Sequence, residues 1–301
     1  MKSALASVLF AVAALAPAGA RQVFRSAVDA VRVDVLVTNG RTPIAGLTAA
    51  DFEVTDNDVA QRISVVSMEE VPISLMLAAD VSTSMAGRRL AILKSASHAA
   101  TSALKAGDRA SLVTFSQNVS LLAGWTADRA GVDAAIERLA VGSGTALNHA
   151  LAFALMYRDQ SQNRALALVF SDGMDTASIL PRADAVSLSD RSDVVVYGVS
   201  LADPRDPRSI GPDHSSGIEL TRPVSRPSVL EAVSQATGGR TFRASSESQL
   251  KDAFVRVIQD FRSRYVLGYT PEGVAPDGWH RLSVTLKRRS GEVTARRGYM
   301  R

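Results

Sequence analysis

Residues 71–84 read VPISLMLAADVSTS, an apolar run that ends in one carboxylate and two hydroxyls. The apolar part has the length and composition of a buried strand, and the pattern from Gly87 to Lys105 is that of a helix. Asp80, Ser82 and Ser84 therefore lie where a strand ends and a helix begins. Their spacing of two residues points all three side chains to one side of an extended turn. Three hard oxygens at the carboxyl end of a central strand suggest a small hard cation such as Mg²⁺.

The length and composition limit which classes of protein and site are possible. A chain of 301 residues is long enough for one large domain or two smaller ones. Its hydrophobic share of 46% and charged share of 21% are those of a globular protein rather than a disordered or fibrous one. The net charge of +4 gives little reason to expect nucleic acid as a partner. The chain has no cysteine, which excludes disulfides, thiolate zinc sites, thiol nucleophiles and a lipid-modified bacterial N-terminus.

The first 20 residues have the pattern of a signal peptide. Lys2 supplies a positive start, residues 4–16 are an apolar segment, and Ala18-Gly19-Ala20 is a small-residue cleavage signal. A transmembrane helix needs about 20 apolar residues, and this segment is shorter. We therefore expect residues 1–20 to be removed and the protein to be exported, as a periplasmic or secreted protein. An uncleaved N-terminal anchor is the alternative.

Apolar strands alternate with helical patterns between Val71 and Arg262. This alternation predicts βαβ units and a largely parallel sheet. The expected strands are 73–79, 110–115, 165–170, 194–199 and a short one at 240–243, and the expected helices are 87–105, 128–139, 146–158, 181–189, 228–237 and 246–262. Residues 119–122 follow the second strand too closely for a crossover, so they are expected to form an antiparallel edge strand.

The two flanks of this region, 21–70 and 263–301, have the period of two that is typical of strands. Each flank is too short to form a secure core alone, and neither has cysteines. We therefore predict an α/β fold in which a doubly wound, mostly parallel, Rossmann-like sheet with one antiparallel edge strand (71–262) is inserted in a small all-β sandwich formed by both termini. Separate packing of each flank against the α/β domain is the alternative. The acidic Asp56-Asn57-Asp58 is interpreted as a plain turn.

Two further loops can complete a cation site. The additional oxygens must come from loops at the same edge of the parallel sheet. Gly142-Ser143-Gly144-Thr145 precedes a helix, and Ser171-Asp172-Gly173 follows the strand 165–170. The alternative role of each such residue is helix capping, as by Thr145 for the helix that starts at Ala146.

Together, Asp80-x-Ser82-x-Ser84, Thr145 and Asp172 resemble the metal-ion-dependent adhesion site of a von Willebrand factor type A domain. Thr83 stands where the family usually has a small glycine. Further stretches resemble a bacterial, acidobacterial-type family of exported proteins related to this domain. These stretches are Phe24-Arg25-Ser26, residues 46–54 (GLTAADFEV), Gly107-Asp108-Arg109, residues 265–269 (YVLGY) and Arg297-Gly298-Tyr299.

The resemblance implies a site for Mg²⁺, with Mn²⁺ or Ca²⁺ as alternatives. Ser82, Ser84 and often Thr145 would bind the ion directly, and Asp80 and Asp172 directly or through water. It also implies a partner protein that offers an Asp or Glu to the open position on the ion. In such domains the last helix, here 246–262, can shift when the site is filled.

Two other functions compete with this adhesion or interaction module: a metal-dependent hydrolase that uses the same site, and a structural module that no longer binds metal. A hydrolase needs a general base, and among the four histidines only His149 is close in sequence to a candidate ligand. The sequence has no GxSxG, Walker A, HExxH or GxGxxG motif. We therefore predict that the protein is not an enzyme.

Two more segments have candidate roles. Residues 203–227 contain five prolines and little apolar content, which predicts a surface loop that is either variable or in contact with a partner. The C-terminal strands carry a basic cluster that is either a solvated strand face or a site for an anionic cell-surface component, such as a polysaccharide or lipid headgroups. Its members are Arg281, Lys287, Arg288, Arg289, Arg296, Arg297 and Arg301.

Overall fold

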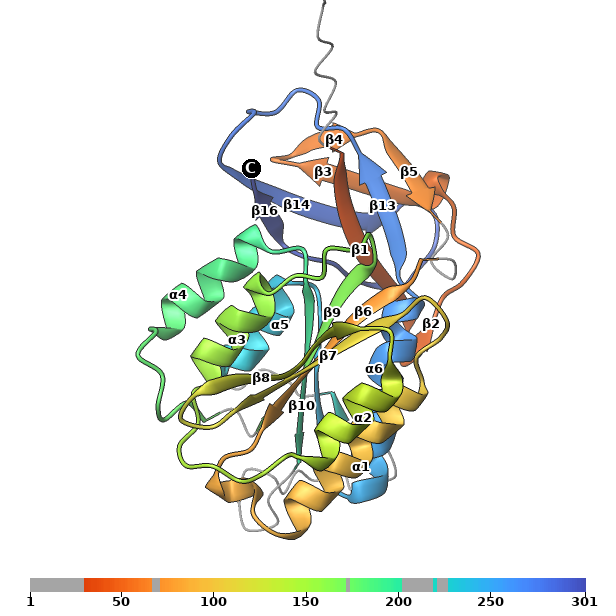
Figure 1. Ribbon diagram of the computed structural model, residues 1–301. Helices are drawn as coiled ribbons and strands as arrows, with labels where there is room; N and C mark the ends of the chain where they lie inside the picture. The colour runs from red at the N-terminus through yellow and green to blue at the C-terminus, as the bar shows by residue number, and fades with distance from the viewer. Residues whose placement is uncertain (1–29, 67–70, 172–173, 202–218, 221–226) are drawn as a thin grey trace, which may run out of the picture.

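The computed structural model describes residues 30–66, 71–171, 174–201, 219–220 and 227–301. The predicted signal peptide, Asp172 and most of the proline-rich segment lie outside these ranges. The described chain forms an α/β unit and a β-sandwich that lies at one end of its central sheet (Figure 1).

The central sheet has seven strands in the order β11-β12-β10-β9-β6-β7-β8. The strands are β6 (Ile73–Asp80), β7 (Arg109–Phe115), β8 (Val119–Thr126), β9 (Arg164–Phe170), β10 (Val195–Leu201), β11 (Glu219–Leu220) and β12 (Thr241–Ala244). Strands β6, β7, β9, β10 and β12 pair in parallel, as predicted. Strand β8 is antiparallel to β7, because the link of residues 116–118 is too short for a crossover. Strand β11 forms a second antiparallel edge that the sequence analysis did not anticipate, since it lies within the segment expected to be a loop.

Helices cover both faces of this sheet (Figure 1). Helices α1 (Arg88–Ser102), α2 (Arg129–Glu137) and α6 (Glu247–Arg262) cover one face, and α3 (Leu147–Met156), α4 (Arg182–Ser187) and α5 (Val229–Ala236) cover the other. Short 3-10 helices lie at Ala49–Asp51 (η1), Thr83–Met85 (η2) and Leu188–Arg191 (η3). All eight residues of β6 are buried, which is why this strand is apolar except for Ser74 and its last residue, Asp80.

The predicted helices are present, with ends that differ by a few residues. Helix α1 ends at Ser102 rather than Lys105, shortly before Gly107, whose φ of 85° does not fit a right-handed helix. The segment expected to be one helix at 181–189 is divided into α4 and η3. Helix α5 begins with a capping box between Ser228 and Glu231, and Gly238 follows its end with a φ of 77°.

The β-sandwich combines strands from both flanks of the chain. One sheet has the order β15-β1-β13-β5, with β2 also paired to β1, and the other has the order β16-β14-β3-β4. The strands are β1 (Val31–Asn39), β2 (Thr42–Pro43), β3 (Phe52–Asp56), β4 (Val59–Gln61), β5 (Ile63–Val66), β13 (Tyr265–Tyr269), β14 (Trp279–Leu286), β15 (Glu292–Thr294) and β16 (Gly298–Met300). A single apolar cluster fills the space between the sheets. The prediction of one sandwich formed by both termini is confirmed.

Strand β4 was not predicted, and it forms a tight hairpin with β3. The turn residues Asn57 and Asp58 have φ angles of 46° and 67°, in the left-handed region that Asn and Asp tolerate. The predicted plain turn is thus confirmed at 57–58, whereas Asp56 is the last residue of β3 and is buried.

A buried polar cluster joins the two sheets of the sandwich. Asp56 has no exposed surface and accepts hydrogen bonds from the hydroxyls of Tyr269 and Tyr299, each at 2.8 Å. The Nδ1 atom of His280 lies 2.8 Å from the other carboxylate oxygen of Asp56. Burial, together with the neighbouring Asp56 carboxylate, raises the pKa of Tyr299 to about 12, so its hydroxyl stays protonated and donates.

Two arginines hold the sandwich against the α/β unit. Arg264 is fully buried, and its Nη2 donates to the Tyr197 hydroxyl at 2.8 Å and to the Gly238 carbonyl at 2.5 Å. Arg164 begins β9, and its Nε donates to Asp34 of β1 at 2.8 Å. Since Arg164 marks the amino end of a seven-residue strand, the carboxyl edge of the sheet lies roughly 23 Å from this junction.

No helix in the described ranges has both the length and the apolar character needed to cross a bilayer.

The contacts of the buried Arg264 guanidinium predict how its removal changes the stability of the fold. Arg264→Met should lower the free energy of unfolding by about 2 kcal/mol, because buried acceptors at Tyr197 and Gly238 lose their donor. Urea unfolding followed by circular dichroism measures this change. Arg288→Met, at an exposed position, is the matched control and should have little effect. Equal stability of the two variants would contradict the role of Arg264.

Helices α1 and α2 are joined by a histidine that predicts a pH dependence. The Nδ1 of His98 lies 3.1 Å from Asp133, and its Nε2 lies 2.6 Å from Glu137. Partial burial works to lower the pKa of His98, but the hydrogen bonds with Glu137 and Asp133 outweigh burial and raise it. A raised pKa means that protonated His98 stabilises the fold fully below about pH 6.5, and that this stability is lost as pH rises through the raised value.

The melting temperature of wild type should therefore exceed that of His98→Gln most at about pH 6 and least near pH 9. Differential scanning fluorimetry over this range measures the difference. A difference that grows with pH would be the opposite of this expectation.

Candidate functional site

The candidate site starts from a buried carboxylate at the end of β6. Asp80 is only 1% exposed. Its Oδ1 accepts a hydrogen bond from the Ser82 backbone N–H at 2.9 Å, and its Oδ2 accepts one from the Ser171 hydroxyl at 2.8 Å. One donor comes from its own turn and the other from the residue that follows β9. The carboxylate is thus held in one orientation at the point where β6 and β9 end side by side.

Two serine hydroxyls converge beside this carboxylate. The Oγ atoms of Ser82 and Ser84 are 3.0 Å apart, which confirms that the two-residue spacing brings the hydroxyls to the same side. Ser82 is 4% exposed, whereas Ser84 is exposed. Two ligands at right angles on a Mg²⁺ ion, each at about 2.1 Å, are roughly 3.0 Å apart. The spacing of the hydroxyls therefore fits adjacent positions on such an ion.

The loop that carries Thr145 contacts this turn. The Gly142 N–H donates to the Val81 carbonyl at 2.7 Å, and the Thr83 hydroxyl donates to the Gly142 carbonyl at 3.2 Å. Thr145 is 7% exposed, and its N–H donates to the Thr176 hydroxyl at 3.0 Å. The structure thus places the loop of Thr145 at the same sheet edge as Asp80, as predicted.

The fifth predicted ligand, Asp172, lies outside the described residues. The residue before it, Ser171, is buried, and its N–H donates to the Val199 carbonyl at 3.1 Å. Ser171 is the residue whose role the sequence analysis missed. The Ser-Asp-Gly motif contained it, but nothing in the motif indicates that its hydroxyl holds Asp80.

The helices next to the site do not use these side chains as caps. The residue that caps α1 is Gly87, and the one that caps α3 is Ala146 rather than Thr145. Ser82 precedes η2 but makes no side-chain capping bond. The alternative role of these residues, helix capping, therefore finds no support in the described structure.

The donor set suits a hard cation. Asp80, Ser82 and Ser84 offer oxygen only, and Mg²⁺ prefers oxygen ligands while keeping some of its waters. Within the described ranges, no three His, Cys, Asp or Glu side chains gather in a way that could hold a metal ion. A cation at this edge would therefore depend on neutral hydroxyls as well as carboxylates.

His149, the candidate general base, has a structural role. Its Nε2 accepts hydrogen bonds from the backbone N–H groups of Ile179 (3.2 Å) and Leu180 (3.1 Å). An Nε2 that accepts these bonds directs its lone pair at the backbone of the loop. The ring therefore holds the loop before α4.

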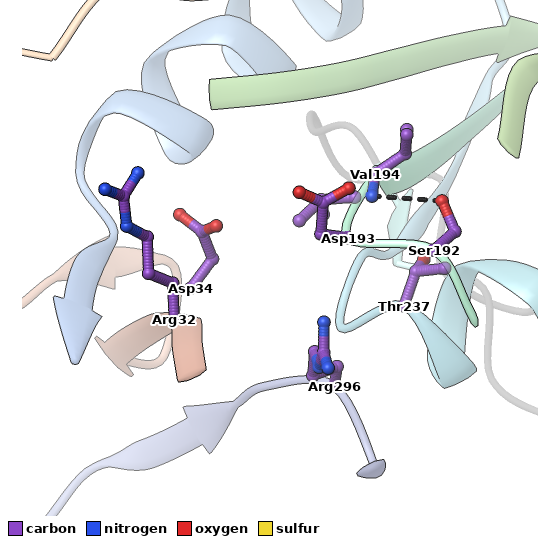
Figure 2. Close-up of a pocket in the computed structure, with 8 residues that line it drawn as sticks. Arg32, Asp34, Ser192, Asp193, Val194, Thr237 and Arg296 are labelled. Carbon is purple, nitrogen blue, oxygen red and sulfur yellow. Dashed lines mark hydrogen bonds between the residues drawn. The ribbon is translucent and has the colours of Figure 1, made fainter. Parts of the chain in front are cut away.

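A second concavity, drawn in Figure 2, lies between the sandwich and the α/β unit. Its two carboxylates, Asp34 and Asp193, are paired with Arg164 and Arg158 respectively. Because both carboxylates are already neutralised, this cleft does not resemble a cation site. It also lies at the amino end of the sheet, away from Asp80.

The C-terminal basic cluster is partly used within the fold. Arg281 pairs with Asp58, and the Nε of Arg289 lies 3.9 Å from Asp51. Arg297 donates to the Gln235 side chain at 3.0 Å, and the Arg296 guanidinium lies over the Tyr299 ring. These contacts favour a solvated strand face over a dedicated surface for an anionic partner.

Comparison with known proteins finds a family whose matched region contains the candidate ligands. Residues 75–174 match the family model for the von Willebrand factor type A domain. This range includes Asp80, Ser82, Ser84, Thr145 and Asp172. A search of curated proteins found no match.

Solved structures share the fold at low sequence identity. A von Willebrand factor type A protein from Catenulispora acidiphila is 15% identical, with a TM-score of 0.52, and the match covers 84% of this chain and 73% of that chain. Proximal thread matrix protein 1 from the mussel byssus is 14% identical, with a TM-score of 0.51. A further structure of that protein, with a zinc-occupied MIDAS motif, has a TM-score of 0.50 at 14% identity. Both mussel matches cover 68% of this chain but only 49% of theirs.

The tight contact at Gly142 predicts a rescue experiment. A Cβ atom at Gly142 would lie 2.4 Å from the Oγ and 2.8 Å from the Cβ of Ser116. Gly142→Ala should therefore displace the loop of Thr145 from the Asp80 turn and lower the free energy of unfolding by about 1–2 kcal/mol. Ser116→Gly removes both clashing atoms, so the double variant should recover most of this loss relative to Ser116→Gly alone. Chemical unfolding of the four proteins tests this, and a lack of recovery would show that the contact is unimportant.

Proposed function

Because the chain carries a von Willebrand factor type A domain, we propose that it is an exported interaction module that binds a partner protein through a divalent cation. The residues that would hold the cation are Asp80, Ser82, Ser84, Thr145 and Asp172. The bound ion would supply a coordination position for a carboxylate oxygen of the partner. The partner would therefore present an Asp or a Glu.

One observation carries this proposal. Ser82 and Ser84 hold their hydroxyls 3.0 Å apart beside a buried carboxylate, and the helix that follows does not use them as caps. The two hydroxyls are hydrogen-bonded to each other beside a fixed carboxylate, and hydroxyl and carboxylate oxygens are the ligands that a hard cation prefers. Two neutral donors leave much of the ion's charge uncompensated, which favours an anionic ligand from outside.

We propose Mg²⁺ as the ion, with Mn²⁺ or Ca²⁺ as alternatives. The mussel byssus structure has zinc at its MIDAS motif. Zinc in proteins favours nitrogen and sulfur ligands, whereas the hydroxyl and carboxylate oxygens here suit Mg²⁺.

Interaction rather than hydrolysis is supported by the place of His149. Its Nε2 is engaged by two backbone N–H groups, so it is not positioned to accept a proton from a metal-bound water. The proposal of export rests on the apolar N-terminal segment with its small-residue cleavage signal at 18–20.

The metal site is tested by cation-dependent stability. Mg²⁺ at ten times its dissociation constant should stabilise wild type by about 1.4 kcal/mol, because it binds only the folded chain. This gain should vanish in Ser82→Ala and in Asp80→Asn, which keeps the shape of the side chain. Ser283→Ala, at an exposed position on β14, should keep the gain. Isothermal titration calorimetry with Mg²⁺ gives the same comparison directly. Equal Mg²⁺ affinity in Ser82→Ala and wild type would contradict the proposed site.

A further inference from the structure

Three exposed apolar side chains lie in the two loops that contact the Asp80 turn or Thr145. Ile179 is 91% exposed, Met174 is 64% exposed and Val141 is 40% exposed. Single exposed apolar residues are ordinary on a protein surface, whereas a group of them marks an interaction site. We call these three residues the apolar rim.

The three residues come from two loops: Val141 lies between α2 and α3, and Met174 and Ile179 lie between β9 and α4. Val141 precedes Gly142, whose N–H donates to Val81 of the Asp80 turn. Met174 precedes the segment in which the Thr176 N–H donates to the Thr145 carbonyl at 2.9 Å. Ile179 is bonded through its own N–H to His149, one helical turn beyond Thr145.

The loop that presents Ile179 is held by its backbone and polar side chains rather than by Ile179 itself. The Asp175 carboxylate accepts bonds from the Asn148 N–H at 2.7 Å and from the Ser178 N–H at 3.1 Å. The Asn148 side chain donates to the Leu180 carbonyl at 3.0 Å. The isoleucine side chain is thus directed into solvent from a firmly held loop, and the fold does not need it there.

Charge at the same edge favours an acidic ligand. Helix α1 begins with Arg88 and Arg89, and its first turn contains no acidic residue. Arg88 is exposed. A basic residue at the N-terminus of a helix works against the helix dipole, so this placement is unfavourable for the helix alone. Both the dipole and Arg88 attract a carboxylate that approaches the site.

We propose that the partner segment is a short peptide in which apolar side chains flank the acidic residue. This inference rests on the proposed function. A carboxylate that reaches the Asp80 turn brings its neighbouring residues over Val141, Met174 and Ile179. Apolar neighbours bury the exposed surface of the rim, whereas polar neighbours would lose water without gaining hydrogen bonds.

A peptide selection on the full chain tests this. A phage-displayed library of random seven-residue peptides is bound to the immobilised protein in Mg²⁺ and eluted with EDTA. The eluted peptides should be enriched in Asp or Glu at one position and in apolar residues beside it. A synthetic copy of the most enriched peptide is then measured by fluorescence anisotropy. Ile179→Ser should weaken its binding about ten-fold, a change of about 1.4 kcal/mol.

Met156→Ser is the matched control. Met156 is also exposed, at 68%, but it lies at the last residue of α3, away from the Asp80 turn. Its substitution should leave peptide binding unchanged, and thermal melts should show that both variants fold.

The outcomes separate the two proposals. Enrichment of acidic peptides with polar neighbours, or unchanged binding in Ile179→Ser, would overturn the role of the apolar rim and leave the proposed function standing. Peptides without an acidic residue, or no enrichment in the EDTA eluate, would overturn the proposed function and this inference with it.

Discussion

Strand β6 is buried along its whole length between β9 and β7, and this constraint decides where the polar side chains of the site can lie. A parallel strand that is covered on both faces can carry a carboxylate only at its end, where the chain leaves the sheet. Asp80 occupies that end. Because the neighbouring strands run in the same direction, the loops after β7 and β9 leave at the same edge, and they bring Ser116 and Ser171 to the Asp80 turn and the loop of Thr145.

The amino end of the same sheet packs against the β-sandwich. There, Arg164 and Arg264 join β1 of the sandwich to β9, β10 and the end of α6. Their hydrogen bonds to Asp34, Tyr197 and Gly238 connect three segments that are distant in sequence. The molecule thus has one edge that is occupied by its own second unit, and the described loops that carry the candidate ligands leave from the opposite edge. The sandwich packs at the amino edge, whereas the loops with the candidate ligands lie at the carboxyl edge.

Much of this arrangement could be predicted because the signals are local. The apolar run before Asp80, the spacing of Ser82 and Ser84, and the glycines around Ser143 each occupy a few consecutive residues. The bond from Ser171 to Asp80 could not be predicted, because it spans 91 positions and depends on the register that pairs Ala79 with Phe170. Strand β4 was missed because its three residues, Val59–Gln61, carry too little pattern to be distinguished from a turn. The insertion of β13 between β1 and β5 has no local signal either.

The sequence by itself determined the kinds of element, their order and the oxygen-bearing residues at 80, 82 and 84. These follow from hydrophobic periodicity and turn chemistry, which act over a few residues. The tertiary structure alone decided which partners these and the neighbouring side chains contact. It gave the N-cap positions of α1 and α3 to Gly87 and Ala146, directed the His149 ring to a backbone loop, and placed the Ile179 side chain in solvent. The physical reason is that a side chain's task depends on its partners in space, and those partners are set by strand register and helix packing between distant segments.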